Sequence, residues 1–214
     1  FSTFFLLKPI MSLISVLEET PAFFISFITI IGLMVGSFLN VVIYRLPVMM
    51  KRSWLQQCAD LRDEPIAELP VFNLITPRSA CTQCGHKLSA LENIPVISYL
   101  FLRGRCSQCQ TRISLCYPLV ETVTALMSGF VAWHFGFGWL TVATLFFVWA
   151  LIALAVIDLN TQLLPDDITL PLLWAGLLVN MNNGFTDIHS AIIGAVAGYL
   201  SLWCIYWCFK LITG

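Results

Sequence analysis

Long apolar runs restrict this chain to a small number of folds. The first run, residues 21–44, contains 24 residues without a charged side chain. As a helix it is about 36 Å long, enough to cross a hydrocarbon core of about 30 Å with some tilt. Hydrophobic residues make up 58% of the 214 residues and charged residues 11%, whereas soluble domains have about 45–50% and about 25%. We therefore expect an all-α polytopic membrane protein.

Later apolar runs indicate four further spans, five in all. The block at 117–157 is too long for one span and is broken at 136–138 by Gly-Phe-Gly, which predicts helices over 117–135 and 139–157. Shorter runs follow at 168–180, with Pro171 expected in the first turn, and at 188–209. We interpret 117–214 as one membrane domain. Residues 1–20 are an N-terminal segment whose first ten residues, before Met11, are expected to be upstream sequence.

One large polar segment, residues 45–116, separates the first two spans. It holds nine of the eleven basic residues, namely Arg45, Lys51, Arg52, Arg62, Arg78, Lys87, Arg103, Arg105 and Arg112. Because Lys and Arg are retained on the cytoplasmic side of a membrane, we expect this segment inside and the N-terminus outside. Alternation then places residues 160–167 inside and 181–187 outside. A net charge of −1 argues against a basic nucleic-acid binder, so the expected partner is the lipid bilayer and not a nucleic acid.

The polar segment contains a doubled cysteine motif. Cys81 and Cys84 form one Cys-x-x-Cys pair, and Cys106 and Cys109 form a second after 21 intervening residues. Two such pairs are typical of a tetrahedral four-sulfur zinc site, although this spacer is slightly longer than usual. A closed site of this kind is structural, so we predict a zinc-ribbon-like loop domain over residues 45–116 without catalysis at the metal. Alternatives are unmetallated thiols, or His86 in place of one sulfur.

Acidic residues at the membrane boundary are the candidate catalytic groups. Asp158 directly follows the apolar run 151–157, where an acid is either functional or an interfacial residue at a helix end. Asp166 and Asp167 are expected to cap the helix that starts near Ile168. Two carboxylates that share one proton can activate water for peptide hydrolysis. The residues alone offer Asp158 without a certain partner.

Glu121 is the other acidic residue near a membrane boundary. It lies in the first part of the predicted second span, five residues after Cys116. We expect it to form a structural ion pair with Arg45 or Arg112.

Several stretches of the sequence together resemble a known family. They are Gly36-Ser-Phe-Leu-Asn-Val-Val-Ile-Tyr-Arg-Leu-Pro47, the doubled cysteine loop, Ile157-Asp-Leu-Asn-Thr-Gln-Leu-Leu-Pro-Asp166, Gly194-Ala-Val-Ala-Gly-Tyr-Leu-Ser-Leu-Trp203 and Phe209-Lys-Leu-Ile-Thr-Gly214. In this order they resemble the type IV prepilin peptidase family over about residues 12–214. The resemblance implies a polytopic inner-membrane aspartic protease that removes the leader from type IV prepilins and type II secretion pseudopilins on the cytoplasmic side. It also implies methylation of the new N-terminus with S-adenosylmethionine.

The resemblance carries over to particular residues. Asp158 matches the family's first catalytic aspartate, and the four cysteines match those of the loop linked to the methyltransferase half. The second catalytic aspartate belongs to a Gly-x-Gly-Asp motif that follows Lys-Leu-x-Thr-Gly, and this sequence ends at Gly214. We therefore expect the chain as printed to lack the complete dyad, the rival being a pair of Asp158 with Asp166 or Asp167.

Two further expectations concern function. The methyl-donor site is not located by the sequence, although residues around Arg45 and the loop are candidates. A different class of function is a membrane-anchored zinc-ribbon adaptor or assembly scaffold without catalysis. A leader-cleavage assay distinguishes that class from the peptidase.

Overall fold

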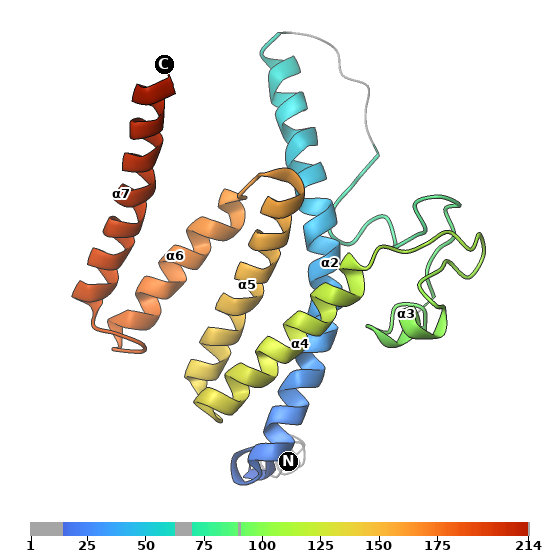
Figure 1. Ribbon diagram of the computed structural model, residues 1–214, viewed down its shortest axis with the longest axis horizontal. Coiled ribbons are helices and arrows are strands. Elements are labelled where there is room, and N and C mark those ends of the chain that lie inside the picture. The colour runs from blue at the N-terminus through green and yellow to red at the C-terminus, as the bar shows by residue number, and fades with distance from the viewer. Residues whose placement is uncertain (1–14, 63–69, 90, 214) are drawn as a thin grey trace, which may run out of the picture. The chain divides into compact units, whose positions relative to one another are not determined.

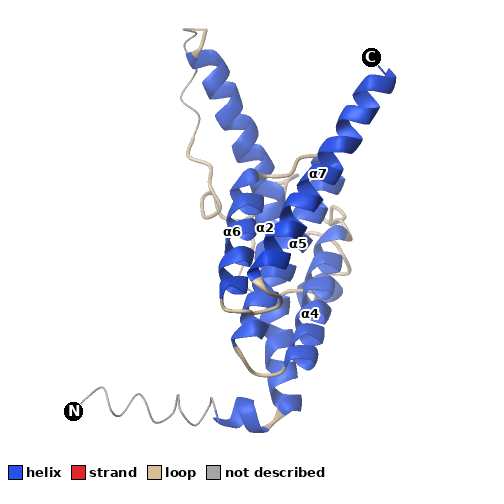
Figure 2. Cartoon of the chain, turned by 90° about the vertical axis from the view of Figure 1, so that its left-hand side faces the viewer, coloured by secondary structure: helices blue, strands red, loops and turns tan. Residues whose placement is uncertain are grey.

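The computed structural model describes residues 15–62, 70–89 and 91–213 (Figure 1). Within these ranges the regular secondary structure is helical, apart from two isolated β-bridges, and this confirms the all-α prediction (Figure 2). Residues 1–10, expected to be upstream sequence, lie outside the described part. The chain forms two compact units, the first ending at Leu164 and the second beginning at Pro165.

Three long helices form the body of the first unit. They are α2 (Pro21–Asp60), α4 (Cys116–Phe135) and α5 (Trp139–Thr161), and they pack against one another (Figure 1). A short helix, α3 (Ile97–Phe101), lies in the loop region between α2 and α4. The break predicted between α4 and α5 is confirmed, because Gly136 ends α4 with a φ of +66° that favours glycine.

Helix α2 is longer than the span predicted from the sequence. Pro21 occupies its first turn, and the helix continues 16 residues past Tyr44 to a total of 40 residues, about 60 Å. The prediction ended the span at the first charged residue, but Arg45 is buried inside the helix. The residues after it include good helix formers, and Pro47 removes only one backbone hydrogen bond.

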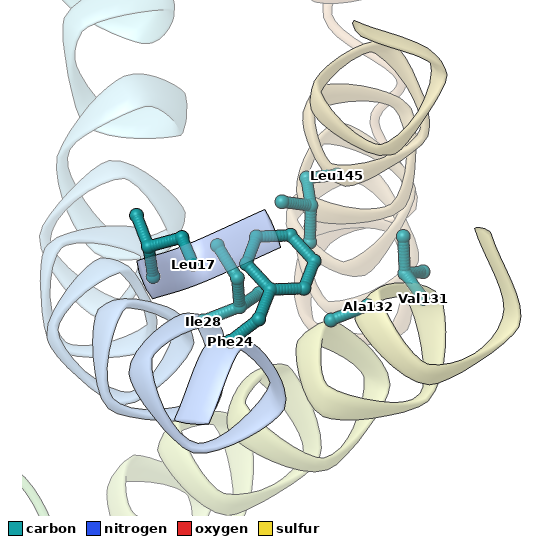
Figure 3. Close-up of a cluster of buried hydrophobic side chains, with 6 residues drawn as sticks. All are labelled: Leu17, Phe24, Ile28, Val131, Ala132 and Leu145. Carbon is teal, nitrogen blue, oxygen red and sulfur yellow. The ribbon is translucent and has the colours of Figure 1, made fainter. Parts of the chain in front are cut away.

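Apolar side chains join the three helices near the N-terminal end of α2. Leu17, Phe24 and Ile28 contact Val131 and Ala132 of α4 and Leu145 of α5, and all six are buried (Figure 3). Burying such side chains stabilises a packed helix pair mainly by close van der Waals contact when the surroundings are lipid.

Small residues let α2 and α4 approach closely along the rest of their contact. A Cβ atom added to Gly36 would lie 2.7 Å from Cα of Glu121, and one added to Gly32 would collide with Ser128. Trp149 of α5 donates a hydrogen bond from Nε1 to the Ser128 hydroxyl at 2.9 Å, so the third helix is tied to the same contact. Such contacts at small residues are typical of helix packing in membranes.

The second unit consists of α6 (Asp166–Met181) and α7 (Ile188–Thr213), which contact each other. Helix α6 begins two residues before the predicted Ile168, so Pro171 lies in its second turn and not in its first. Asp166 and Asp167 occupy the first turn, where negative charge favours the helix dipole, and Pro165 takes the N-cap position that we expected an aspartate to fill.

Among the residues that the structure describes, three helices are long and apolar enough to cross a membrane, namely α2, α5 and α7. The remaining two predicted spans correspond to α4, with 20 residues, and α6, with 16 residues. A polytopic membrane protein is therefore supported, while the total of five spans stays a prediction.

Candidate metal centre and active site

The four cysteines of the doubled motif meet at one point. The sulfur atoms of Cys81, Cys84, Cys106 and Cys109 all lie within 4.8 Å of one another. The sulfur atoms of Cys81 and Cys109 are 3.7 Å apart, and those of Cys84 and Cys106 are 3.9 Å apart. Four sulfurs at about 2.3 Å from a tetrahedral zinc ion are roughly 3.8 Å apart. The cluster therefore fits a four-sulfur metal site.

Each cysteine pair sits in the same kind of backbone turn. In the first turn, Gly85 N donates to Cys81 O at 2.9 Å and Cys81 N donates to His86 O at 2.8 Å. In the second, Gln110 N donates to Cys106 O at 3.1 Å and Cys106 N donates to Thr111 O at 2.9 Å. Each turn brings its two thiol groups close together, which is what a shared metal ion requires.

The two turns are copies of one unit displaced by 25 residues. The flanking bonds also correspond, since Leu88 N donates to Ser79 O at 2.9 Å and Ile113 N donates to Gly104 O at 2.8 Å. Sequence reasoning found the repeated cysteines but missed the wider repeat. The constant separation of 25 residues could have revealed the wider repeat. The position of Gly85, with φ +70°, is occupied by Gln110, with φ +58°, in the second turn, so the two sequences look less alike than the two backbones.

Glu92 links the two turns. Its carboxylate accepts hydrogen bonds from Ser89 N at 2.8 Å in the first turn and from the Ser107 hydroxyl at 2.5 Å in the second. The bond from Ser107, with those from Ser89, lowers the pKa of Glu92 to about 2. His86, which we considered as a metal ligand, lies with Nε2 3.4 Å from Glu92 and is not part of the sulfur cluster.

The thiols of Cys84 and Cys109 have different surroundings, and their pKa values are shifted in opposite directions. Hydrogen bonds from Thr111 lower the pKa of the Cys109 thiol to about 6. The backbone N–H of His86 favours the Cys84 thiolate, but desolvation and hydrogen bonds with the other cysteines raise its pKa to about 11. A divalent cation removes this conflict because it deprotonates every thiol that coordinates it.

Arg45 fastens the loop to α2. Its guanidinium donates to Asn73 O at 2.9 Å and to Pro77 O at 2.6 Å, and it lies 5.8 Å from the centre of the Phe72 ring. The expected ion pair with Glu121 is wrong, because the buried guanidinium is occupied by backbone carbonyl groups of the loop. The sequence could not predict these partners, because every residue has a backbone carbonyl group and no residue pattern shows which ones accept a hydrogen bond.

Glu121 is engaged by neutral donors and not by Arg45 or Arg112. Its Oε2 accepts a hydrogen bond from Val96 N at 2.7 Å, and its Oε1 lies 3.5 Å from Asn40 Nδ2. Val96 has a φ of +58°, a conformation that β-branched residues rarely adopt. The contact with Glu121 holds this strained residue in place beside α4.

Two cavities lie on either side of the junction between α2, α4 and the loop. The larger has a volume of about 620 Å³ and reaches from Asn40 and Glu121 to the cysteine turns. The smaller, of about 370 Å³, is bordered by α2, by the start of α4 and by Asn160 and Thr161 of α5. Asn40, Tyr44, Ser114 and Tyr117 line both, so the two cavities adjoin each other.

Asp158 lies in the last turn of α5, on its exposed side. The preceding Ile157 is fully buried, and Gln162 ends the helix in a left-handed conformation by donating its N–H to Asp158 O at 2.8 Å. The Asp158 side chain has no hydrogen bond or ion pair with the residues that the structure describes. It is thus available to a substrate or to a second acid. Asp166 and Asp167 are exposed in the other compact unit.

Comparison with known proteins now places the chain. Residues 30–135 match the model of the bacterial peptidase A24 N-terminal domain, and residues 145–213 match that of the type IV leader peptidase family. The chain belongs to the type IV leader peptidase family. The first match contains both cysteine turns and Glu121, and the second contains Asp158. No solved structure matches the chain.

Curated relatives of the leader peptidase family share about half of their residues with this chain. A prepilin leader peptidase/N-methyltransferase of Pseudomonas aeruginosa is 50% identical over 205 residues, which cover 95% of this chain and 71% of the relative. The proteins of that name from Pseudomonas putida and Neisseria gonorrhoeae are 52% and 48% identical, with the same coverage. The resemblance inferred from the motifs is thereby confirmed.

Proposed function

We propose that this chain performs both activities named for its relatives, cleavage of the leader from prepilins and methylation of the new N-terminus. The observation that carries the proposal is the identity of about half of the residues over 95% of the chain. Pseudopilins of type II secretion are the second expected substrate class, as the family resemblance implies. The cysteine cluster and the exposed Asp158 lie in the same compact unit, which is compatible with two linked activities.

The peptidase activity is assigned to Asp158 as one of two catalytic aspartates. One carboxylate takes a proton from water as the water oxygen attacks the scissile carbonyl carbon, and the other gives a proton to the amine as the C–N bond breaks. Asp158 suits this role because its carboxylate is free of partners among the described residues. The family resemblance implies that the second aspartate follows Gly214, and Asp166 is the rival within the printed sequence.

The methyltransferase activity is assigned to the loop domain over residues 45–116. When bound, S-adenosylmethionine supplies an electrophilic methyl group for the free amine that cleavage leaves. The chain must hold that amine unprotonated, and the junction of α2, α4 and the loop offers a cavity of about 620 Å³ in which the two reactants could meet.

The metal in the cysteine cluster is proposed to be zinc in a structural role. Four thiolates complete a tetrahedral shell and leave no position for water or substrate. Cys81, Cys84, Cys106 and Cys109 would thus hold the two turns together, and Glu92 would brace them from the other side.

The protein is proposed to lie in the cell inner membrane, with the N-terminus outside and the loop in the cytoplasm. The basic residues of segment 45–116 support this orientation. The C-terminal turn of α5 then lies on the cytoplasmic side, where a leader peptide is accessible.

The test is a cleavage assay on prepilin in membranes, with the chain extended after Gly214 by the corresponding C-terminal segment of the Pseudomonas aeruginosa relative. Asp158→Asn is expected to reduce the cleavage rate by about 100-fold or more, because a positioned acid or base contributes about that much. Asp187→Asn is the matched control, since Asp187 caps α7 and asparagine caps equally well.

Three outcomes separate the alternatives. Near-normal cleavage by Asp158→Asn would contradict the assigned role. Cleavage that needs Asp166 but not the added segment would favour the rival pair. Binding of prepilin without turnover by either form would support the adaptor function.

A further inference from the structure

The larger cavity has the size and composition of a small-molecule site. Its volume of about 620 Å³ lies within the range of about 300–1,000 Å³ in which ligand pockets fall. Side chains of both charges and several aromatic rings line it, including Phe72, Arg78, Tyr99, Arg112 and Glu121. A ligand that carries both charges together with a planar ring system suits such walls.

Glu121 gives the cavity a carboxylate that lacks a cation. Its side chain is 92% buried, with only 8% exposed, and accepts hydrogen bonds from the neutral donors Val96 N and Asn40 Nδ2. A carboxylate has about four acceptor positions, so part of its capacity is unused. Within the described ranges no basic side chain forms an ion pair with it. A cationic group of a ligand would supply the missing partner.

Arginines on the loop give the same cavity an opposite charge. Arg78 and Arg112 are both exposed and line the cavity, and their guanidinium groups have no hydrogen bond or ion pair with the described residues. A guanidinium binds a carboxylate through two parallel hydrogen bonds. The cavity therefore offers complementary groups for both ends of a free amino acid.

Tyr99 provides a fixed aromatic ring in this cavity. Its hydroxyl donates to Ile113 O at 3.4 Å, and its ring lies so close to Gly104 that an added Cβ would fall 2.7 Å from Cζ. Gly104 has a φ of +67°, so both its backbone and its neighbour favour glycine. A held tyrosine ring is suited to stacking with a nucleobase.

We propose that this cavity binds S-adenosylmethionine, with Glu121 facing its cationic groups and Arg112 its carboxylate. The inference rests on the proposed methyltransferase function and assigns that function a location. Arg112 would bind the carboxylate of the ligand's amino acid part, and Glu121 would face its sulfonium. The ring of Tyr99 would stack with its adenine.

A lipid headgroup also combines an ammonium with an anion and is the alternative ligand of the larger cavity. The position of the smaller cavity favours the methyl donor. The two cavities share Asn40, Tyr44, Ser114 and Tyr117, and the smaller one reaches Asn160 and Thr161, just after Asp158. An amine produced at the end of α5 would thus enter a cavity that adjoins the one proposed for the donor, and could reach its methyl group through their shared border. Methylation after cleavage needs this short path, whereas lipid binding does not.

The experiment measures binding directly on the purified, zinc-loaded chain in detergent. Equilibrium dialysis with radiolabelled S-adenosylmethionine gives the Kd, and ultraviolet cross-linking followed by peptide mapping locates the ligand. Glu121→Gln is expected to raise the Kd about tenfold or more, because a hydrogen bond to a charged group is roughly twice as strong as a neutral one. Glu19→Gln removes an exposed carboxylate outside the cavity and is expected to leave the Kd unchanged.

Folding is controlled by measuring the zinc content and thermal unfolding of each variant. If Glu121→Gln does not fold, Arg112→Gln takes its place, because Arg112 is exposed and bonded only through its backbone. That variant is also expected to raise the Kd about tenfold, and cross-links are expected within residues 93–121.

Each remaining outcome has a separate meaning. Equal Kd values for all variants, with cross-links elsewhere, would overturn the proposed location while methylation of a pre-cleaved pilin peptide would still support the function. Displacement of the label by glycerophosphoethanolamine at similar concentration would reassign the cavity to a lipid headgroup. Glu121-dependent binding without methyl transfer would support the site and contradict the function.

Discussion

The bundle of α2, α4 and α5 and the cysteine loop belong to one compact unit, yet different interactions hold each of them. In the bundle, backbone packs against backbone at Gly32 and Gly36, and apolar side chains complete the contact. In the loop, polar groups dominate, namely the four thiols and the Glu92 carboxylate, and the Arg45 guanidinium of α2 donates to loop carbonyl groups. The stability of the bundle therefore depends on close packing, and that of the loop on polar groups and metal binding. A change that unfolds one region should leave the other folded.

Removing one metal ligand should have the largest effect, and it should stay within the loop. Cys106 is the most buried of the four cysteines, and Cys106→Ser leaves three thiolates around the ion. Because structural zinc sites contribute about 10 kcal/mol or more to folding, the metal content should fall from about one equivalent to near zero. Metal analysis and limited proteolysis check this prediction, and the loop should be cut while α4 and α5 stay intact. Loss of the whole bundle would show that the two regions are not independent.

Adding a side chain at the contact between α2 and α4 should destabilise the bundle and leave the loop intact. Gly36→Leu places a side chain where Cα of Glu121 already lies, and overpacking costs about 1–3 kcal/mol or more. Thermal unfolding in detergent should shift to lower temperature while one equivalent of zinc is retained. Gly194→Leu on α7 is the control, because nothing lies within 4 Å of a Cβ added there.

Arg45 should be the residue whose change uncouples the two regions. Arg45→Lys keeps the charge but removes one of the paired donors to Asn73 O and Pro77 O. We expect a loss of about 1–3 kcal/mol in the contact between loop and helix. Hydrogen exchange should rise over residues 70–80 without a change in α4 or in zinc content. Unchanged exchange there would mean that the metal alone positions the loop.

The smallest effect should come from the non-equivalent position in the repeated turns. Gln110→Gly relieves a left-handed residue and should stabilise the loop by about 1 kcal/mol, whereas Gly85→Gln should destabilise it by a similar amount. Competition with a chelator measures both, as slower and faster loss of zinc. Shifts of the same sign would contradict the equivalence of the two turns.

The sequence predicts best what is encoded over a few residues. The Cys-x-x-Cys pairs specify their own turns, and Gly136 ends α4 by backbone conformation alone, so both were predictable. The length of α2 was not, because a charged residue such as Arg45 ends an apolar run but does not end a helix. The environment of Glu121 was also out of reach, since its partners Val96 and Asn40 lie 25 and 81 residues away in the chain.

Candidate site residues show the same division. The cysteine cluster could be inferred from spacing, and Asp158 from its place after an apolar run. The cavities could not, because they arise where α2, α4 and the loop pack together, and no local pattern records that packing. Asn40 and Tyr117, for example, line both cavities, and nothing in the sequence around either residue predicts this.

The unbroken course of α2 has a consequence for how the protein responds to its surroundings. At about 60 Å the helix is roughly twice as long as a bilayer core is thick, so if its first half spans the core, its second half must extend beyond the lipid. Arg45, near the middle of α2, attaches the loop to the helix at a fixed distance from its ends. A thicker or thinner membrane would then raise or lower the two cavities relative to the lipid surface, and lipid composition would become a physical determinant of how a membrane-anchored substrate reaches them.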